Sequence, residues 1–197
     1  MKASIHIPVL AQEVSDLLCT APSESKPVYV DGTLGGGGHT RLLAAAAGED
    51  GRVLAVDRDP EAIRRAEITL QGLPIFVAQG SYTDVPELMK ELEIRQVNGI
   101  LIDLGLSSDQ LEDDQRGFSF HAQGPLDLRF DPTEGKSAAQ LLERISPEHL
   151  ADLIFQYGEE RYSRRIARAI CKRQRERPIT QAAELADIVR DCIPKAS

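Results

Sequence analysis

The feature that most restricts the fold of this chain is a glycine-rich stretch near its start, DGTLGGGGHT at residues 31–40. A short apolar run, residues 28–30, precedes it, and a helical pattern, residues 40–47, follows it. A strand, a glycine turn and a helix start in this order bring bare backbone close to a nucleotide-like ligand. Glycine is needed because a Cβ atom would block both the tight turn and the approaching ligand. The stretch therefore predicts a site for a nucleoside-containing cofactor.

The first half of the chain alternates between apolar runs and helical patterns. The apolar runs cover residues 28–30, 53–56, 75–78 and 99–102, and the helical patterns cover residues 40–47, 60–70 and 85–93. Continuous apolar strands separated by helices are typical of a parallel sheet covered on both faces. Asp59 followed by Pro60 is a typical helix start, with an N-cap residue before proline. We predict an α/β, Rossmann-like fold whose sheet is incomplete.

The alternation stops after Asp103. The Gly, Asp and Pro content of residues 109–135 predicts a long ordered loop. Helical patterns without strands follow at residues 137–143, 147–157, 159–174 and 180–193. Ser137 with Gln140 resembles a capping box, and Ser146 before Pro147 is a second cap. We expect an α/β cofactor domain at residues 1–108 and a loop and helical domain at residues 109–197.

Composition excludes several classes of protein. The chain has no apolar run near the roughly 20 residues that a membrane span needs, and its start lacks the layout of a signal peptide. Its three cysteines have no metal-ligand spacing, so we expect reduced thiols and no metal site. These observations favour a cytoplasmic protein without a membrane partner.

The charge is unevenly distributed. A net charge of −8 argues against a broad basic surface for nucleic acid, yet residues 161–177 hold eight basic residues and one acid, Glu176. The spacing puts four cations on one helix face and an apolar stripe opposite: Arg161, Arg165, Arg168 and Lys172 against Tyr162, Ile166, Ala169 and Ile170. Such a run is usually a solvated surface. In an acidic chain, a run that nearly lacks acids favours contacts with phosphate groups.

Three cofactor interpretations compete for the glycine turn. A P-loop needs a lysine after its last glycine, and His39 stands there instead. The dinucleotide pattern Gly-x-Gly-x-x-Gly fits poorly, since a start at Gly35 puts Thr40 in the third glycine position. S-adenosylmethionine sites have an acidic residue at the end of the first strand and a looser glycine turn. Asp31 and the glycines at 35–38 suit that interpretation.

Carboxylates at predicted strand ends support the third interpretation. Asp57 ends the second strand, where it could accept hydrogen bonds from ribose hydroxyls, because Asp59 suffices as the helix cap. Asp103 ends the fourth strand and is expected to face the same crevice as Asp31 and Asp57. Converging carboxylates favour a polyhydroxylated cationic ligand. Tyr82, after the third strand, either stacks on adenine or packs in the core.

Several stretches of the chain, in this order, resemble the RsmH (MraW) family. They are HIPVL at 6–10, DGTLGGGGHT at 31–40, AVDRDP at 55–60, DLGLSSDQL at 103–111, RGFSF at 116–120, GPLDLR at 124–129 and YGEER at 157–161. The resemblance covers essentially the whole chain. It implies a class I S-adenosylmethionine-dependent methyltransferase fold with an inserted all-helical domain linked to substrate recognition.

The resemblance also implies an activity and a set of cofactor contacts. The activity is N4-methylation of a decoding-site cytidine of 16S ribosomal RNA in the small subunit, with S-adenosylmethionine as methyl donor. The cofactor contacts carried over to matching positions are Gly37, Gly38, His39, Asp57, Tyr82, Asp103 and Gln110. Family members continue past the point matching Ser197 with further strands, so we expect this chain to be a fragment or a truncated reading frame.

No catalytic residue follows from the sequence. Many amino-methylating enzymes have Asn/Asp-Pro-Pro-Tyr after the fourth strand, whereas this chain has DLGL from Asp103. A catalytic role for Asp103 is therefore a hypothesis that rests only on its position at the end of the fourth strand. The loop at 116–120 either closes over cofactor or substrate or is held in the core by Phe118 and Phe120. The alternatives for the whole chain are a non-catalytic cofactor- or RNA-binding fragment and a nicotinamide-dependent oxidoreductase.

Overall fold

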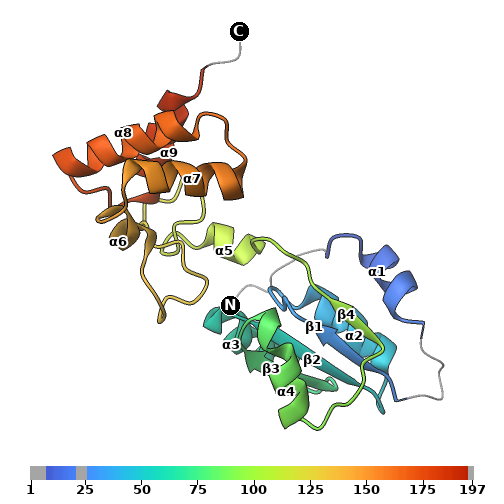
Figure 1. The fold of residues 1–197 in the computed structure, drawn as a ribbon. Helices are drawn as coiled ribbons and strands as arrows, with labels where there is room; N and C mark the ends of the chain where they lie inside the picture. Colours follow the sequence, from blue (N-terminus) through green and yellow to red (C-terminus); the bar gives the residue numbers. More distant parts are fainter. Residues whose placement is uncertain (1–7, 21–25, 195–197) are drawn as a thin grey trace. The chain divides into compact units, whose positions relative to one another are not determined.

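The computed structural model describes residues 8–20 and 26–194 of the chain (Figure 1). Of the HIPVL stretch, His6 and Ile7 lie outside the described residues. The chain divides into two compact units, Met1–Asp109 and Gln110–Ser197, which are described separately below. No helix in the described ranges is both long enough and apolar enough to cross a membrane.

Unit 1 is built on one parallel sheet. Its strands in the described part of the chain are β1 (Val28–Asp31), β2 (Arg52–Asp57), β3 (Ile75–Gln79) and β4 (Gly99–Leu101). They lie in the order β3-β2-β1-β4, with Val30 paired to both Leu54 and Ile100. The predicted α/β class with a parallel sheet is confirmed.

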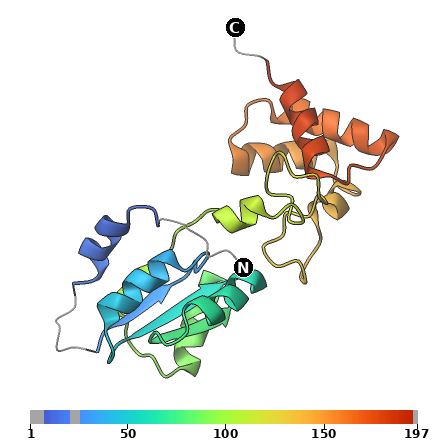
Figure 2. The same cartoon turned by 180° about the vertical axis from the view of Figure 1, so that it is seen from behind.

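Helices cover both faces of this sheet, as Figures 1 and 2 show. On one face α2 (Gly38–Ala47) and α3 (Pro60–Thr69) pack on alternate strand residues such as Val53 and Ala55. On the other face α4 (Val85–Glu91), which follows the short helix η1 (Tyr82–Asp84), packs on Leu54 and Val56. The helix α1 (Ala11–Leu18), which the apolar pattern did not predict, contacts α2.

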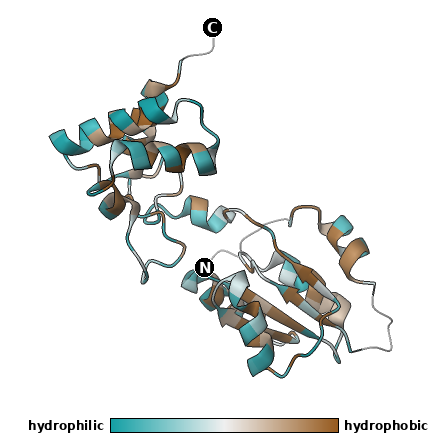
Figure 3. Ribbon diagram, in the orientation of Figure 1, coloured by the Kyte–Doolittle hydropathy of each residue, from teal (hydrophilic) through white to brown (hydrophobic). Residues whose placement is uncertain are grey.

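Unit 2 consists of helices and a long loop. Its helices in the described range are α6 (Ala138–Leu142), α7 (Pro147–Gly158), α8 (Ser163–Glu176) and α9 (Ala182–Cys192), and α5 (Ser108–Glu112) spans the unit boundary. Leu126 of the loop, Leu150 of α7 and Ile166 of α8 meet in its core. Figure 3 shows α8 as a largely hydrophilic ribbon with hydrophobic segments, whereas β1 and β2 of unit 1 are mainly hydrophobic.

The predicted helix caps are present. Asp59 accepts a hydrogen bond from the Glu61 N–H at 3.0 Å, Ser137 and Gln140 form the reciprocal capping box, and Ser146 accepts from the His149 N–H. These side chains replace the intrahelical partners that the first N–H groups of each helix lack.

Two boundaries differ from prediction. The helix predicted at 159–174 begins at Ser163, because α7 runs to Gly158 and Glu159 turns into the left-handed region with φ of 51°. Arg161 therefore precedes α8. The predicted loop at 109–135 contains most of α5.

The core of unit 2 generates a stability prediction. Ile166 is only 2% exposed, so Ile166→Ala removes buried apolar volume and should lower the free energy of unfolding by about 2–5 kcal/mol. Urea denaturation followed by circular dichroism measures the change. Ile68→Ala, at a 64% exposed position on α3, is the control and should change little. Equal losses from the two variants would contradict the packing described here.

Candidate functional site

The candidate site lies in unit 1, at the carboxyl ends of the parallel strands. The strand order reverses between β1 and β4, because the chain crosses to the far side of β1 after β3. Open α/β sheets bind ligands at such a point. The topology gathers residues from the strand ends and the segments that follow them. Those from the predicted set are Gly37, Gly38, His39, Asp57, Tyr82 and Asp103.

Asp31 is the innermost carboxylate of this region. It ends β1 and has no exposed surface. Its side chain accepts hydrogen bonds from the Thr40 hydroxyl at 2.6 Å and the Thr33 N–H at 3.1 Å. The expectation that Asp31 faces an open crevice is therefore wrong. A carboxylate this deeply buried must be satisfied by protein donors, and here they come from the glycine stretch itself.

The glycine turn joins β1 to α2 through backbone that other residues rarely adopt. Gly35 has φ of 50° and Gly37 has φ of 78°, both in the left-handed region. A Cβ on Gly38 would come within 2.6 Å of Pro8 Cγ, so glycine is also required there by close packing. The turn ends with His39 and Thr40 in the first turn of α2.

Asp57 holds the glycine turn from the end of β2. One carboxylate oxygen accepts the Gly35 N–H at 2.7 Å, and the other accepts the Asp59 N–H at 2.9 Å. Burial raises the pKa of Asp57 above its ordinary range, although these two hydrogen bonds oppose the rise. Each oxygen keeps a further lone pair. Asp57 can thus hold the turn and still accept hydrogen bonds from hydroxyl groups of a ligand.

The side chains of His39, at the end of the glycine turn, and Asp103, just after β4, lie close to each other. His39 is 7% exposed, and neither of its ring nitrogens has a hydrogen-bond partner among the described residues. Its Nε2 lies 3.8 Å from a carboxylate oxygen of Asp103, whose side chain is 42% exposed. The backbone of Asp103 is fixed by Thr33, because the Asp103 N–H donates a hydrogen bond to the Thr33 hydroxyl at 2.7 Å. A buried imidazole without a hydrogen bond calls for a polar partner outside the protein.

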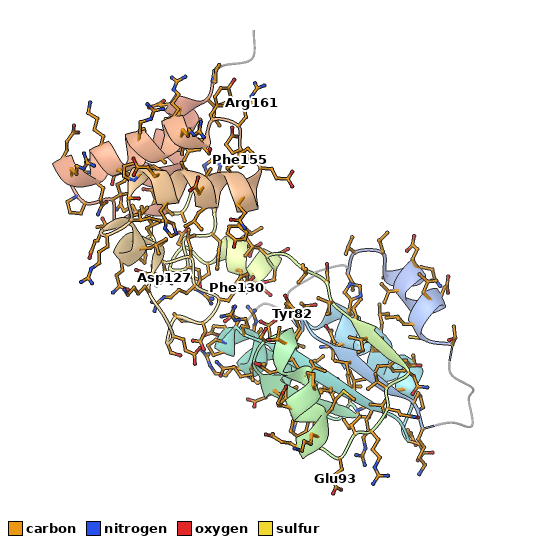
Figure 4. All side chains as sticks on the ribbon, viewed as in Figure 1. Tyr82, Glu93, Asp127, Phe130, Phe155 and Arg161 are labelled. Carbon is orange, nitrogen blue, oxygen red and sulfur yellow. The ribbon has the colours of Figure 1, made fainter. Side chains whose placement is uncertain are left out.

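Tyr82, labelled in Figure 4, lies on η1 just after β3 and is 43% exposed. Ser81 and Asp84 form a reciprocal capping box on η1, which fixes the backbone that carries the Tyr82 side chain. Gly32 permits the close approach of Tyr82, because a Cβ there would lie 3.0 Å from Tyr82 Cβ and 3.4 Å from Ile102 Cγ1. The Tyr82 ring is thus open enough to stack on a flat ligand group.

Gln110 and the loop at 116–120 belong to unit 2. Gln110 is buried in α5 at 5% exposure. Phe118 packs on Phe130, with ring centroids 5.5 Å apart, whereas Phe120 is 76% exposed. The interpretation that both phenylalanines hold the loop is therefore wrong for Phe120. The buried Arg116 holds it instead, by donating to the carbonyls of Arg129 and Phe130.

Sequence reasoning missed the two threonines that organise the site. Thr40 supplies one of the donors that Asp31 needs, and Thr33 positions Asp103. A signal existed, because a carboxylate at the end of a buried strand requires nearby donors and both threonines flank the glycines. No cluster of three or more His, Cys, Asp or Glu side chains in residues 8–20 and 26–194 is arranged to hold a metal ion.

A second feature lies on unit 2. The α8 basic face consists of exposed cations spaced along one side of the helix and its approach: Arg161, Arg164, Arg165, Arg168, Lys172 and Arg175. None of them forms an ion pair with a described carboxylate, whereas Arg173 and Arg177 both pair with Glu184. Ile166 and Ile170 are buried on the opposite side. The predicted division of this helix into a basic and an apolar face is confirmed.

The buried Asp31 generates a prediction about pH. Burial is the main cause that raises the pKa of Asp31, so the folded chain binds a proton there more readily than the unfolded chain. Stability from this group therefore falls as pH rises from about 4 through the raised pKa. Asp31→Asn keeps the shape, and its amide can donate to Thr40. The variant should unfold at higher urea than the parent chain at pH 7, by a margin that shrinks as the pH falls toward about 4.

Urea titrations at several pH values measure the margin, with Asp50→Asn at an exposed position as the control. A margin that stays constant or grows as the pH falls from neutral toward about 4 would show that Asp31 carries no cost of burial.

Comparison with known proteins identifies the family of the chain. The sequence matches the MraW methylase family over residues 3–197. It is 44% identical over 191 residues to the ribosomal RNA small subunit methyltransferase H of Syntrophotalea carbinolica, covering 96% of this chain and 60% of that protein. The chain thus spans less than two thirds of the relative's length. The family match extends across nearly the whole sequence, and the chain belongs to the MraW methylase family.

Proposed function

We propose that this chain binds S-adenosylmethionine in unit 1 and serves methylation of 16S ribosomal RNA at N4 of a decoding-site cytidine. The observation that carries the proposal is His39, a buried imidazole with no hydrogen bond to a described residue, at a glycine turn between two strand-end carboxylates. The methylase family and the ribosomal RNA methyltransferase relative support it. A ribosomal RNA substrate within the small subunit implies a cytoplasmic protein.

The described residues fit S-adenosylmethionine. Asp57 has lone pairs left for the two ribose hydroxyls, and the open Tyr82 ring suits the adenine. Gly37 and Gly38 pack on Leu70 and Pro8 and are kept as cofactor contacts through their backbone, on the strength of the resemblance. His39 with Asp103 offers polar groups for the charged methionine end. Gln110 is kept as a cofactor contact on the strength of the resemblance. When bound, S-adenosylmethionine supplies an electrophilic methyl group.

The chemistry requires the chain to orient a poor nucleophile. A cytosine amino group has its lone pair delocalised into the ring, so an acceptor that draws on its N–H bonds makes the nitrogen more reactive. Asp103 is the candidate for that acceptor, because it follows β4 with a partly exposed carboxylate whose backbone Thr33 fixes. Its role is proposed from position and exposure.

The RNA part of the proposal rests on the α8 basic face. Six exposed cations in the described part of unit 2, none paired with a described carboxylate, make a strip of positive charge on a chain of net charge −8. Phosphate oxygens are the partners that such a strip favours. Unit 2 would then hold RNA while unit 1 holds the cofactor.

The cofactor assignment is tested by binding. Calorimetric titration should show binding of S-adenosylmethionine and none of NAD. Asp57→Ala should weaken the binding at least tenfold, because hydrogen bonds to a charged group are worth about 1.5–3 kcal/mol. Asp57→Asn, which keeps the volume, should also bind less tightly.

Asp50→Ala removes an exposed carboxylate from the same unit and should leave the affinity unchanged. Binding of NAD instead of S-adenosylmethionine would favour the oxidoreductase alternative. Methylation of small ribosomal subunits by the chain distinguishes turnover from cofactor and RNA binding alone.

The RNA assignment is tested by salt dependence. The double variant Arg165→Ala, Arg168→Ala should bind single-stranded RNA less tightly and reduce the slope of log affinity against log salt by about 0.7 for each phosphate that is no longer neutralised. Fluorescence anisotropy between 50 and 200 mM salt, about the range over which phosphate binding weakens strongly, measures both quantities. Arg190→Ala, at an exposed arginine that pairs with Asp187, is the control. An unchanged slope would exclude the α8 basic face from RNA binding.

A further inference from the structure

Two large aromatic side chains lie exposed on the last turn of α7. Phe155 is 61% exposed and Tyr157 is 76% exposed. Earlier in the same helix Leu150 and Ala151 are buried in the core of unit 2, whereas residues 155–159 are all exposed. The last turn of α7 thus extends past the core. Single exposed apolar side chains are ordinary, but here two rings project from different sides of one protruding turn, and each offers a face on which a flat partner can stack.

This turn leads directly into the α8 basic face. Figure 4 shows Phe155 and Arg161 at the end of unit 2 where α7 is followed by the turn into α8. The Arg161 guanidinium lies over the Tyr162 ring, 4.7 Å from its centroid, which limits the positions open to this cation. Arg164 and Arg165 follow, both exposed. Aromatic rings and cations therefore lie close together in the sequence, between Phe155 and Arg165.

The segment also contains two acids, Glu159 and Glu160. The Glu160 carboxylate accepts the Tyr162 N–H at 2.7 Å and so has a partner within the turn. Glu159 is exposed at the left-handed residue that ends α7. The negative charge of Glu159 repels a phosphate group nearby and so opposes the binding of a polyanion at this turn.

We propose that the α7–α8 turn binds single-stranded RNA, with bases stacked on Phe155 and Tyr157 and phosphates held by Arg161, Arg164 and Arg165. The inference rests on the proposed function in taking RNA as the substrate, and it adds the residues that contact unpaired bases. Stacking on aromatic rings beside a cationic track is the way proteins hold single strands without reading sequence. A duplex keeps its bases inside the helix and offers these rings nothing to stack on.

The test measures anisotropy of a labelled single-stranded RNA of mixed sequence, its duplex and polyglutamate with the full chain. The single strand should bind more tightly than the duplex and polyglutamate. Phe155→Ala and Tyr157→Ala should each weaken single-strand binding by about tenfold, as expected when one base can no longer stack. Tyr157→Phe should restore the affinity, because it keeps the ring. Glu159→Gln should strengthen binding.

Ile68→Ala, at a comparably exposed position in unit 1, is the matched control and should have no effect. If RNA binds with the expected salt dependence but is indifferent to both alanine variants, the stacking proposal fails while RNA binding by the α8 basic face survives. If polyglutamate or the duplex binds as well as the single strand, the turn recognises charge alone and the proposal is wrong. If no RNA binds, the RNA part of the proposed function fails as well.

Discussion

The rest of unit 1 depends on one buried interaction, the Asp31 carboxylate held by Thr40 and the Thr33 N–H. A carboxylate without exposed surface carries a large desolvation cost, so its donors must be fixed. Both donors belong to the segment that leaves β1, and Thr40 lies in the first turn of α2. The interaction therefore ties strand, glycine turn and helix into one geometry.

That geometry determines where the remaining polar groups of the site lie. Asp57 holds the same turn from β2 through the Gly35 N–H, and Thr33 holds the backbone of Asp103 just after β4. Three strands are thus joined at their carboxyl ends by hydrogen bonds to backbone or side-chain groups of one short stretch, residues 31–40. His39 follows these anchors and retains ring nitrogens without a partner among the described residues. The described residues thus organise the turn with their own groups, and we infer that His39 is the group left for a ligand.

The two units present different chemistry. Unit 1 has converging carboxylates and an imidazole, which suit a small polyhydroxylated cation. Unit 2 has the α8 basic face, which suits a polyanion. The two faces of α8 have different roles. Ile166 and Ile170 are buried in the core of unit 2, whereas Arg165 and Arg168 are exposed on the opposite face. We infer that cofactor and RNA are handled by separate units.

The sequence by itself determined the parallel sheet, the helix caps and the two faces of α8, because apolar periodicity and capping are local and repeat at short range. It also identified the glycine turn and the family. Only the tertiary structure decided that Asp31 is buried, that Thr33 and Thr40 serve the site, and that Phe120 is exposed. Those outcomes depend on which residues meet across the fold. A carboxylate at a strand end looks the same in sequence whether it faces a ligand or a threonine from the next helix, and only packing distinguishes the two.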